Sequence, residues 1–413
     1  MDLLRFMTAG SVDDGKSTLI GRLLYDSKAI MIDQLEAIGK QSKNKEAGEI
    51  DLALLTDGLR AEREQGITID VAYKYFTTPK RKFIIADAPG HVQYTRNMVT
   101  GASNVDLAII LIDARNGVVE QTLRHSIITS LLGIPHVVVA VNKMDMVKYS
   151  QDVFNNIVID YTKVAQQLGL KEVQYIPISA LDGDNIVDKS KHMNWYEGES
   201  LLHLLETVEV KDDITFEEAR LCVQYVIRPQ VDHLHDYRGY AGKILSGSYK
   251  KGDEVTVLPS GLRSKIKSIE TNTKEVNEAS ALQSVVIQLE DDLDVGRGDI
   301  IVQTKYQPTV SQELELLVCW MDSKPLIPGN RYLFQHNSKV VKSVVREIEY
   351  KLDVNSLKKQ YGPSAAGLND VIKVSLKTAS PIPYDPYAVL KSNGSGILID
   401  ETSNLTVGAC MIQ

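Results

Sequence analysis

Residues 10–17 read Gly-Ser-Val-Asp-Asp-Gly-Lys-Ser and follow a short apolar run at residues 4–9. An amphipathic stretch at residues 16–25 comes directly after them. A glycine-rich turn between a strand and a helix lets backbone N–H groups surround a phosphate, and the helix N-terminus adds partial positive charge. We therefore predict a phosphate-binding loop, in which Lys16 neutralises β- and γ-phosphate oxygens and Ser17 binds Mg²⁺.

Two further motifs follow at the ends of apolar runs, in the order that a nucleotide-hydrolysing domain requires. The first of them, Asp-Ala-Pro-Gly-His at residues 87–91, comes after the run KFIIA at residues 82–86. At the end of a buried strand, Asp87 can hold Mg²⁺ through water and the N–H of Gly90 can reach the γ-phosphate. Together with the loop, this motif predicts binding of a nucleoside triphosphate.

The second motif predicts which base is bound. Residues 142–145 read Asn-Lys-Met-Asp and close the apolar run at residues 136–142. The carboxylate of Asp145 can accept hydrogen bonds from guanine N1–H and from the N2 amino group, whereas adenine has neither donor and would leave the carboxylate unpaired. We expect GTP and GDP rather than ATP, with Ser179 and Ala180 adding a backbone N–H to guanine O6.

Several residues in polar loops are candidates for switching and hydrolysis. Thr68 is placed to close on Mg²⁺ and the γ-phosphate, and to be released when the γ-phosphate is lost. His91 is a candidate for orienting or polarising the attacking water. Val12 and Ile67 are apolar residues in polar surroundings that would restrain His91. Asp13 is a candidate ligand for a monovalent cation beside the phosphates.

The candidate site therefore combines three sets of residues. The nucleotide-binding set is Gly10, Ser11, Val12, Asp13, Asp14, Gly15, Lys16, Ser17, Thr18, Asp87, Ala88, Pro89, Gly90, His91, Asn142, Lys143, Met144, Asp145, Ser179, Ala180 and Leu181. The catalytic set is Lys16, Thr68 and His91, and the metal-binding set is Ser17, Thr68 and Asp87. We expect GTP or GDP together with Mg²⁺ as the ligands of this site.

The pattern of apolar and polar residues changes near residue 212. Before it, apolar runs alternate with amphipathic stretches, which is typical of a doubly wound, mostly parallel sheet covered by helices. The expected strands there are residues 4–9, 82–86, 107–113, 136–142 and 174–179, and the expected helices are residues 16–25, 122–132 and 154–168. After it, β-branched runs broken by Gly, Pro and Asp indicate two all-β barrels. Their expected strands are residues 242–246, 253–258, 264–269, 285–289 and 299–302, then residues 314–321, 340–350 and 371–378. We expect an α/β P-loop GTPase domain at residues 1–212 and barrels at residues 213–306 and 307–413.

Composition limits the partners and the compartment. The chain has 413 residues and a formal net charge of −8. Residues 211–413 carry 24 basic and 26 acidic side chains, so this half lacks the basic excess that nonspecific nucleic-acid binding requires. Its three cysteines, Cys222, Cys319 and Cys410, are far apart and indicate neither a disulfide framework nor a zinc site. No apolar run approaches the roughly 18 residues of a membrane span. We expect a cytoplasmic protein that binds neither nucleic acid nor membrane.

The ordered motifs and the β-rich second half resemble the translation-factor class of P-loop GTPases over essentially the whole chain, which implies an elongation-factor-like fold. Within that class, the chain is most similar to the GTPase-subunit family of the bacterial heterodimeric sulfate adenylyltransferase. The stretches that carry this resemblance are residues 10–30, 54–70, 87–103 and 124–147, and DYRGYAGKILSG, GDEVTVLPSG and SNLTVGA at residues 236–247, 252–261 and 403–409.

The resemblance implies that GTP hydrolysis on this chain drives formation of adenosine 5′-phosphosulfate and pyrophosphate from ATP and sulfate. Adenylyl transfer would then belong to a smaller catalytic subunit of the ATP pyrophosphatase type, in a heterodimer or a larger assembly. Some family members carry a fused adenylylsulfate kinase; because no second phosphate-binding loop is present, we expect a monofunctional chain. Two features depart from the family: Ala88 stands where many relatives have Thr or Cys, and residues 231–237 are longer than usual.

Two other functions share this fold. An elongation factor that carries aminoacyl-tRNA uses the same switches, but its barrels are expected to present basic surface, which the net charge of −2 over residues 211–413 does not favour. A signalling GTPase that acts only as an interaction switch is disfavoured by the two sizeable barrels.

Overall fold

The computed structural model describes residues 2–28, 70–89, 95–210, 217–229, 237–272 and 274–413. The chain forms two compact units. The first comprises Met1–Val210 with Asp353–Lys358, and the second comprises Lys211–Leu352 with Lys359–Gln413. In the part of the chain that the structure describes, no helix is long and apolar enough to cross a membrane.

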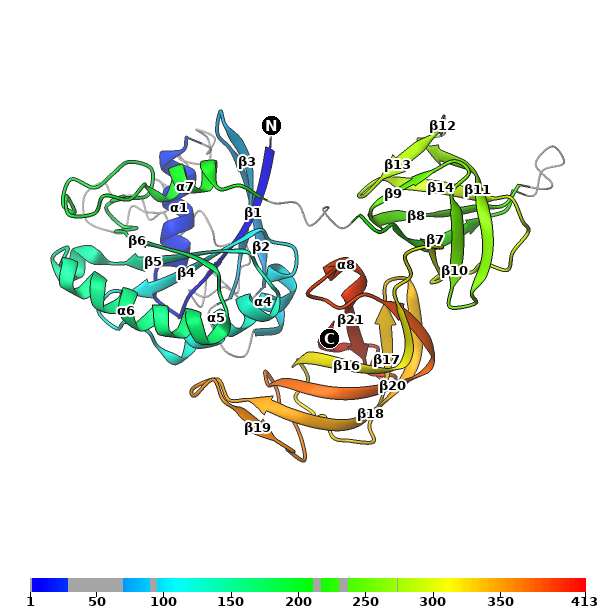
Figure 1. Cartoon of the computed structure of the whole chain (residues 1–413). Helices are drawn as coiled ribbons and strands as arrows, with labels where there is room; N and C mark the ends of the chain where they lie inside the picture. The colour runs from blue at the N-terminus through cyan, green and yellow to red at the C-terminus, as the bar shows by residue number, and fades with distance from the viewer. Residues whose placement is uncertain (1, 29–69, 90–94, 211–216, 230–236, 273) are drawn as a thin grey trace. The chain divides into compact units, whose positions relative to one another are not determined.

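A six-stranded sheet forms the centre of the first unit, with the strand order β2-β3-β1-β4-β5-β6 (Figure 1). Its strands are β1 (Asp2–Ala9), β2 (Ala72–Thr77), β3 (Arg81–Asp87), β4 (Leu107–Asp113), β5 (His136–Asn142) and β6 (Glu172–Pro177). All neighbours pair in parallel except β2 and β3, which pair antiparallel. Every residue of β4 is buried, as expected for a central strand of a parallel sheet that is covered on both faces.

Helices cover both faces of this sheet. They are α1 (Lys16–Asp26), α4 (Thr95–Ala102), α5 (Glu120–Leu131), α6 (Gln151–Leu168) and α7 (Leu201–Thr207), with a short 3-10 helix η4 (Met144–Val147). One core contains apolar residues of α1 and α7 against one face of the sheet, and another contains residues of α6 against the other face. The predicted doubly wound, mostly parallel domain is confirmed.

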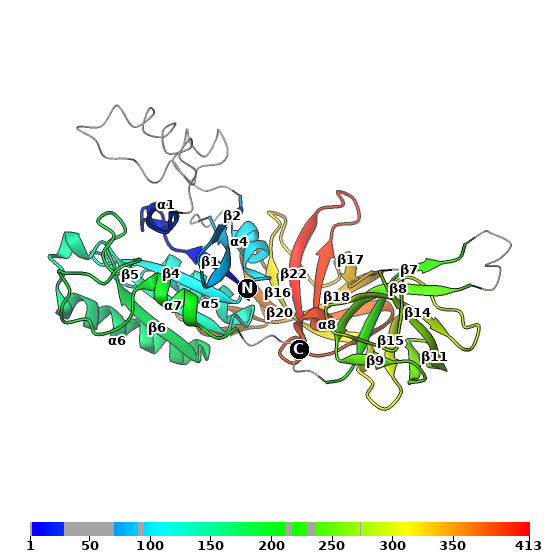
Figure 2. The same cartoon turned by 90° about the horizontal axis from the view of Figure 1, so that it is seen from above.

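The first seven-stranded sheet of the second unit closes into a barrel (Figure 2). Its strands are β7 (Arg220–Ile227), β8 (Gly239–Ser246), β10 (Glu254–Leu258), β11 (Leu262–Thr271), β12 (Lys274–Val276), β14 (Ser284–Leu289) and β15 (Ile300–Gln303). The order β10-β15-β7-β8-β14-β11-β12 is completed by pairing of β10 with β11, so six strands form a ring and β12 extends it. Strands β9 (Ser248–Lys250) and β13 (Glu278–Ser280) form a separate small sheet.

A second barrel follows, with the order β17-β21-β22-β16-β20-β18-β19 and closure by pairing of β17 with β18. Its strands are β16 (Thr309–Trp320), β17 (Arg331–His336), β18 (Lys339–Leu352), β19 (Lys359–Tyr361), β20 (Val371–Tyr384), β21 (Ser395–Ile399) and β22 (Thr406–Ile412), with a short helix α8 (Lys391–Gly394). Trp320 and Tyr332 pack edge to face in its core, with ring centroids 5.5 Å apart. Closure removes the unpaired strand edges that would otherwise favour aggregation.

A buried ion pair joins the two barrels. The fully buried guanidinium of Arg220, on β7, donates from Nε and Nη2 to the two carboxylate oxygens of Asp385, each at 3.0 Å. The Nδ2 atom of Asn393 donates to the same carboxylate at 2.7 Å, and Arg220 also donates to the carbonyl oxygen of Tyr306 at 2.9 Å. Nη2 of Arg220 also donates to Oε2 of Glu218 at 2.5 Å, but the Glu218 side chain is 36% exposed. Loss of Asp385 therefore removes the buried carboxylate that compensates the guanidinium charge.

We expect Asp385→Ala to destabilise the second unit by about 3 kcal/mol, since it removes the bidentate partner of Arg220. Urea unfolding followed by the fluorescence of Trp320, in a Trp195→Phe background, measures the effect. The matched control is Glu278→Ala, because Glu278 pairs with Lys250 in the same unit at a site where both side chains are largely exposed. Equal stability of the two variants would contradict a structural role for the buried pair.

Candidate functional site

The loop between β1 and α1 has the backbone of a phosphate-binding loop, and the side chain of Lys16 binds back to the carbonyl oxygens of this loop. Lys16, the first residue of α1, is buried, and its Nζ donates to the carbonyl oxygens of Gly10 and Ser11, both at 2.9 Å. Asp14 accepts a hydrogen bond from the backbone N–H of Ser11, and burial raises the pKa of its carboxyl. The loop is therefore fixed by its own side chains.

Asn142, at the end of β5, connects this loop to the loop after β6. Its Nδ2 donates to the carbonyl oxygen of Asp14 at 2.7 Å, and its Oδ1 accepts from the backbone N–H of Ala180 at 2.9 Å. Gly15 has a φ of +91°, and a Cβ there would lie 2.5 Å from Asn142 Nδ2. Only glycine meets both the backbone angle and the space at this position.

Lys143 and Asp113 reinforce the same connection. Nζ of Lys143 donates to the carbonyl oxygen of Asp13 and lies 3.0 Å from Oδ2 of Asp113, at the end of β4. Arg115 binds the same carboxylate at 2.6 Å. Although burial opposes ionisation of Asp113, the hydrogen bonds from Arg115 and Lys143 lower its pKa well below the ordinary value. Asp113 and Arg115 were not predicted from the sequence, because neither lies in a motif.

The carboxylate expected to bind the base is oriented by a neighbouring loop. Asp145, in η4, accepts a hydrogen bond from the Ser179 hydroxyl at 2.8 Å. The backbone N–H of Ser179 donates to Asp184, and that of Ala180 donates to Asn142, so both are engaged within the protein. Leu181, which follows, is exposed, whereas Met144 is buried under η4.

The remaining predicted residues divide into those described and those outside the described residues. Asp87, Ala88 and Pro89 are buried at the end of β3, and Asp87 accepts from the Thr8 hydroxyl at 3.2 Å. Ser17 and Thr18 lie half-buried in the first turn of α1, whereas Val12 and Asp13 are exposed, Asp13 with a φ of +66°. The predicted residues Gly90, His91, Ile67 and Thr68, and most of the long stretch 231–237, lie outside the described residues.

These residues fit a bound nucleotide. An ammonium group has three N–H donors, and loop carbonyls engage two of those of Lys16, which leaves one for a phosphate oxygen. Burial lowers the pKa of Lys16, while Asp87 and Asp14 oppose that shift. The described residues contain no cluster of three or more His, Cys, Asp or Glu side chains suited to a metal. A site with one carboxylate is the type that Mg²⁺ occupies together with hydroxyl groups, water and phosphate oxygens.

Arg22 is a site residue that the motifs did not predict. It lies on α1, about two turns beyond the loop, and its Nε donates to the carbonyl oxygen of Ala180 at 3.3 Å. Its Nη2 donates to the carbonyl oxygen of Leu181, and Asp26 lies 3.6 Å from its guanidinium. A residue of the phosphate-loop helix therefore holds the loop that contributes to the base side of the site.

His125, on α5, is a second residue outside the motifs. It is buried, its Nε2 lies 3.1 Å from Gln121 Nε2, and its Nδ1 has no hydrogen-bond partner among the described residues. Burial, followed by the charges of Lys16 and Arg124, lowers its pKa to about 3. His125 is therefore neutral at physiological pH.

Comparisons with known proteins agree with this geometry. The family model described as "Elongation factor Tu GTP binding domain" matches residues 1–228, and that described as "GTP-eEF1A C-terminal domain-like" matches residues 313–413. The fold and the site thus define a GTPase of the translation-factor class. A "Sulfate adenylyltransferase subunit 1" of Alteromonas mediterranea is 52% identical over 413 residues, covering 100% of this chain and 87% of that protein.

A second relative with the same name, from Aliarcobacter butzleri, is 53% identical over 414 residues and again covers 100% of this chain and 87% of that protein. The chain belongs to the sulfate adenylyltransferase subunit 1 family. A crystal structure of sup35 complexed with GDP aligns with a TM-score of 0.45 and 22% identity, covering 100% of this chain and 93% of that one.

We expect Arg22→Ala to weaken GDP binding by roughly tenfold, since two backbone carbonyls of the base-side loop lose their charged donor, at about 1.4 kcal/mol. Equilibrium titration with fluorescent GDP measures the loss. The effect should be much smaller for 2-aminopurine riboside diphosphate, which lacks the O6 atom that this loop is expected to bind. The control is Lys163→Ala, because Lys163 forms an exposed ion pair with Asp160 on α6. Equal losses for both nucleotides would indicate a general structural role for Arg22.

The stability of the first unit should fall as the pH decreases from about 6.5, the pKa of an unfolded histidine. His125 stays neutral in the folded state down to pH about 3, so the unfolded state binds one proton more in this window. By pH 5 this amounts to about 2 kcal/mol. The helical circular dichroism signal, which comes almost wholly from the first unit, reports its urea unfolding. His125→Gln should flatten the dependence and the exposed variant His203→Gln should not; the same slope in both would refute this prediction.

Proposed function

We propose that this chain is the GTP-hydrolysing subunit of sulfate adenylyltransferase. It couples GTP hydrolysis to formation of adenosine 5′-phosphosulfate and pyrophosphate from ATP and sulfate. Adenylyl transfer takes place on a smaller catalytic subunit of the ATP pyrophosphatase type, with which this chain forms a heterodimer that can assemble further.

The observation that carries the GTPase part of the proposal is the double hydrogen bond of Asn142. It joins the phosphate-binding loop at Asp14 to the base-side loop at Ala180. The coupling part rests on identity of 52% over 413 residues, which includes both barrels, to a protein named as sulfate adenylyltransferase subunit 1.

Each group in the site has a proposed task. The N–H groups of residues 10–15 and the ammonium of Lys16 bind the phosphates, where their positive charge stabilises the transferring phosphoryl group. Asp145 accepts from guanine N1–H and N2, and the N–H of Leu181 is the donor to guanine O6 that remains after those of Ser179 and Ala180 are engaged within the protein. An adenine base leaves Asp145 unpaired.

Mg²⁺, held by Ser17, Thr68 and Asp87, neutralises charge on the β- and γ-phosphates when it is bound. Thr68 closes on the γ-phosphate and is released when the γ-phosphate is lost, and His91 orients the attacking water. Val12 and Ile67 restrain His91, and Asp13 binds a monovalent cation. GTP and GDP states coupled in this way must differ in affinity for the partner subunit.

The organisation of the chain suits this division of labour. We propose a GTPase domain at residues 1–212 and barrels at residues 213–306 and 307–413. All three cysteines are free and buried, which agrees with a protein of the reducing cytoplasm. The alternative function of an aminoacyl-tRNA carrier is disfavoured, because residues 211–413 have a net charge of −2 and lack the basic excess that tRNA binding favours.

The proposal is tested by a substitution that changes which nucleoside triphosphate the reaction requires. In a complex of this chain with its small subunit, Asp145→Asn should move the dependence of adenosine 5′-phosphosulfate synthesis from GTP to xanthosine triphosphate by roughly 10²-fold, since the amide donates where the carboxylate accepts. Synthesis measured with each nucleotide gives the readout. Asp182→Asn is the matched control, because Asp182 also accepts from the Ser179 hydroxyl, at 3.1 Å.

Two results contradict the proposal in different ways. If Asp145→Asn keeps its preference for GTP, the guanine assignment is wrong. If nucleotide preference moves to xanthosine triphosphate but synthesis proceeds equally without any such nucleotide, the site is correct and the coupling is wrong.

A further inference from the structure

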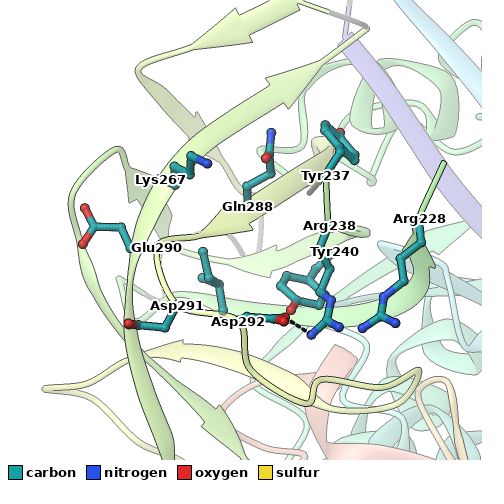
Figure 3. Close-up of a pocket in the computed structure, with 10 residues that line it drawn as sticks. Arg228, Tyr237, Arg238, Tyr240, Lys267, Gln288, Glu290, Asp291 and Asp292 are labelled. Carbon is teal, nitrogen blue, oxygen red and sulfur yellow. Dashed lines mark ion pairs between the residues drawn. The ribbon is translucent and has the colours of Figure 1, made fainter. Parts of the chain in front are cut away.

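A cavity of about 470 Å³ lies in the first barrel, and none of its lining residues belongs to the nucleotide site (Figure 3). Side chains from β8, β11 and β14 line it, together with the segment after β14 and Arg228, which directly follows β7. Small-molecule sites typically have volumes of about 300–1,000 Å³. The cavity is therefore large enough for a ligand of mononucleotide size, and much larger than a single phosphate ion needs.

Two arginines face each other across neighbouring strands at one end of the cavity. Val226 and Tyr240 are paired across β7 and β8, and Arg228 and Arg238 stand two residues further along on the same face. Like charges placed opposite each other destabilise a strand pair. Among the residues drawn in Figure 3, Asp292 forms an ion pair with Arg238 alone. Of these two guanidinium groups, Asp292 therefore compensates that of Arg238, and an oxyanion of a ligand would bind between Arg228 and Arg238.

The other walls are held in place before any ligand arrives. Tyr237 donates to Oε1 of Glu270 at 3.1 Å, and Gln288 donates to the same oxygen at 2.9 Å. Burial and the neighbouring Glu270 carboxylate raise the pKa of Tyr237 to about 12, so it remains a neutral donor. Arg238 donates to the carbonyl oxygen of Leu293 at 2.7 Å, which fixes one of the two guanidinium groups. A wall ordered in this way reduces the entropic cost of binding.

The opposite end of the cavity has a different character. Figure 3 shows Lys267 and Glu290 there, away from the two arginines. Asp291 accepts from the Ser264 hydroxyl at 2.8 Å. Carboxylates at this end can accept hydrogen bonds from hydroxyl or amino groups of a ligand. The cavity thus has two arginines and Tyr237 toward one end, the fixed amide of Gln288 between, and Lys267 with the carboxylates of Glu290 and Asp291 toward the other end.

We propose that this cavity is a second ligand site that binds an organic phosphate ester of about mononucleotide size. Its phosphate lies between Arg228 and Arg238, its planar ring packs against Tyr237, and its hydroxyl groups donate to Glu290 and Asp291. The site is distinct from the nucleotide site, because no residue belongs to both.

Adenosine monophosphate and inorganic phosphate are suitable probes. The full chain is first saturated with GDP, so that the guanine site is occupied, and is then titrated calorimetrically with each probe. We expect one saturable site for adenosine monophosphate and at least tenfold weaker binding of inorganic phosphate. Arg228→Gln should weaken adenosine monophosphate binding at least tenfold, and Arg228→Lys should have an intermediate effect, since lysine keeps the charge but not the planar fork.

The matched control is Arg263→Gln, because Arg263 is an exposed arginine on β11 that does not line the cavity. It should bind adenosine monophosphate within twofold of the parent chain. Thermal unfolding of each variant verifies its fold, and Tyr237→Leu supplies a second test, which should lose adenosine monophosphate but retain inorganic phosphate. The proposal is overturned if adenosine monophosphate does not bind at millimolar concentration, if Arg228→Gln binds like the control, or if inorganic phosphate binds as tightly as the ester.

Discussion

One side chain, the amide of Asn142, connects the two halves of the nucleotide site. Its two ends bind the backbone at Asp14 and at Ala180, which are separated by more than 160 positions in the sequence. A buried amide whose donor and acceptor are both satisfied is worth more than its separate hydrogen bonds, since loss of either partner leaves a buried polar atom unpaired. The phosphate side and the base side therefore keep a fixed separation, which binding of one rigid nucleotide requires.

Charged groups around this amide extend the same function. Lys143 connects the loop at Asp13 to the end of β4 through Asp113, and Arg22 connects α1 to the base-side loop. All of these groups lie at the carboxyl ends of parallel strands or at the helix that follows, where ligands bind in open α/β sheets. The described part of the site is consequently built on the strands and the helix of the first unit.

The second unit uses a different principle. Its strands pair into closed barrels, so each barrel buries its own core and leaves no long free edge. The fully buried guanidinium of Arg220, on β7, donates two hydrogen bonds to the carboxylate of Asp385, which follows β20 of the second barrel. Such a pair specifies one arrangement of the two barrels more than it adds stability.

Sequence patterns predicted the central strands well, because a short continuous apolar run is typical of a parallel strand that is buried on both faces. Strands β4 and β5 begin and end at the residues expected. Strand β2 was not predicted, because it has no continuous apolar run. Phe76 is its one buried residue, whereas Tyr73 and Tyr75 are exposed. Short barrel strands such as β9 and β13 pair with each other across a long stretch of intervening sequence, which no local pattern encodes.

The candidate site shows the same limit. Motif spacing predicted the loop, Asp87 and the residues of the base motif, because their chemistry depends on residues close together in the chain. Arg22 and Asp113 could not be predicted in that way, since they contribute through contacts with residues 159 and 30 positions away. Burial of His125 likewise depends on packing of α5 and not on its neighbours in sequence.

The central claim is that GTP hydrolysis on this chain is coupled to adenylyl transfer from ATP to sulfate on a partner subunit. The most direct measurement is the rate of GTP hydrolysis by the reconstituted complex of the two chains with ATP present, with and without sulfate. If the two reactions are coupled, sulfate accelerates GTP hydrolysis in step with formation of adenosine 5′-phosphosulfate. A GTP hydrolysis rate that is the same with and without sulfate, while adenosine 5′-phosphosulfate accumulates, would contradict this coupling.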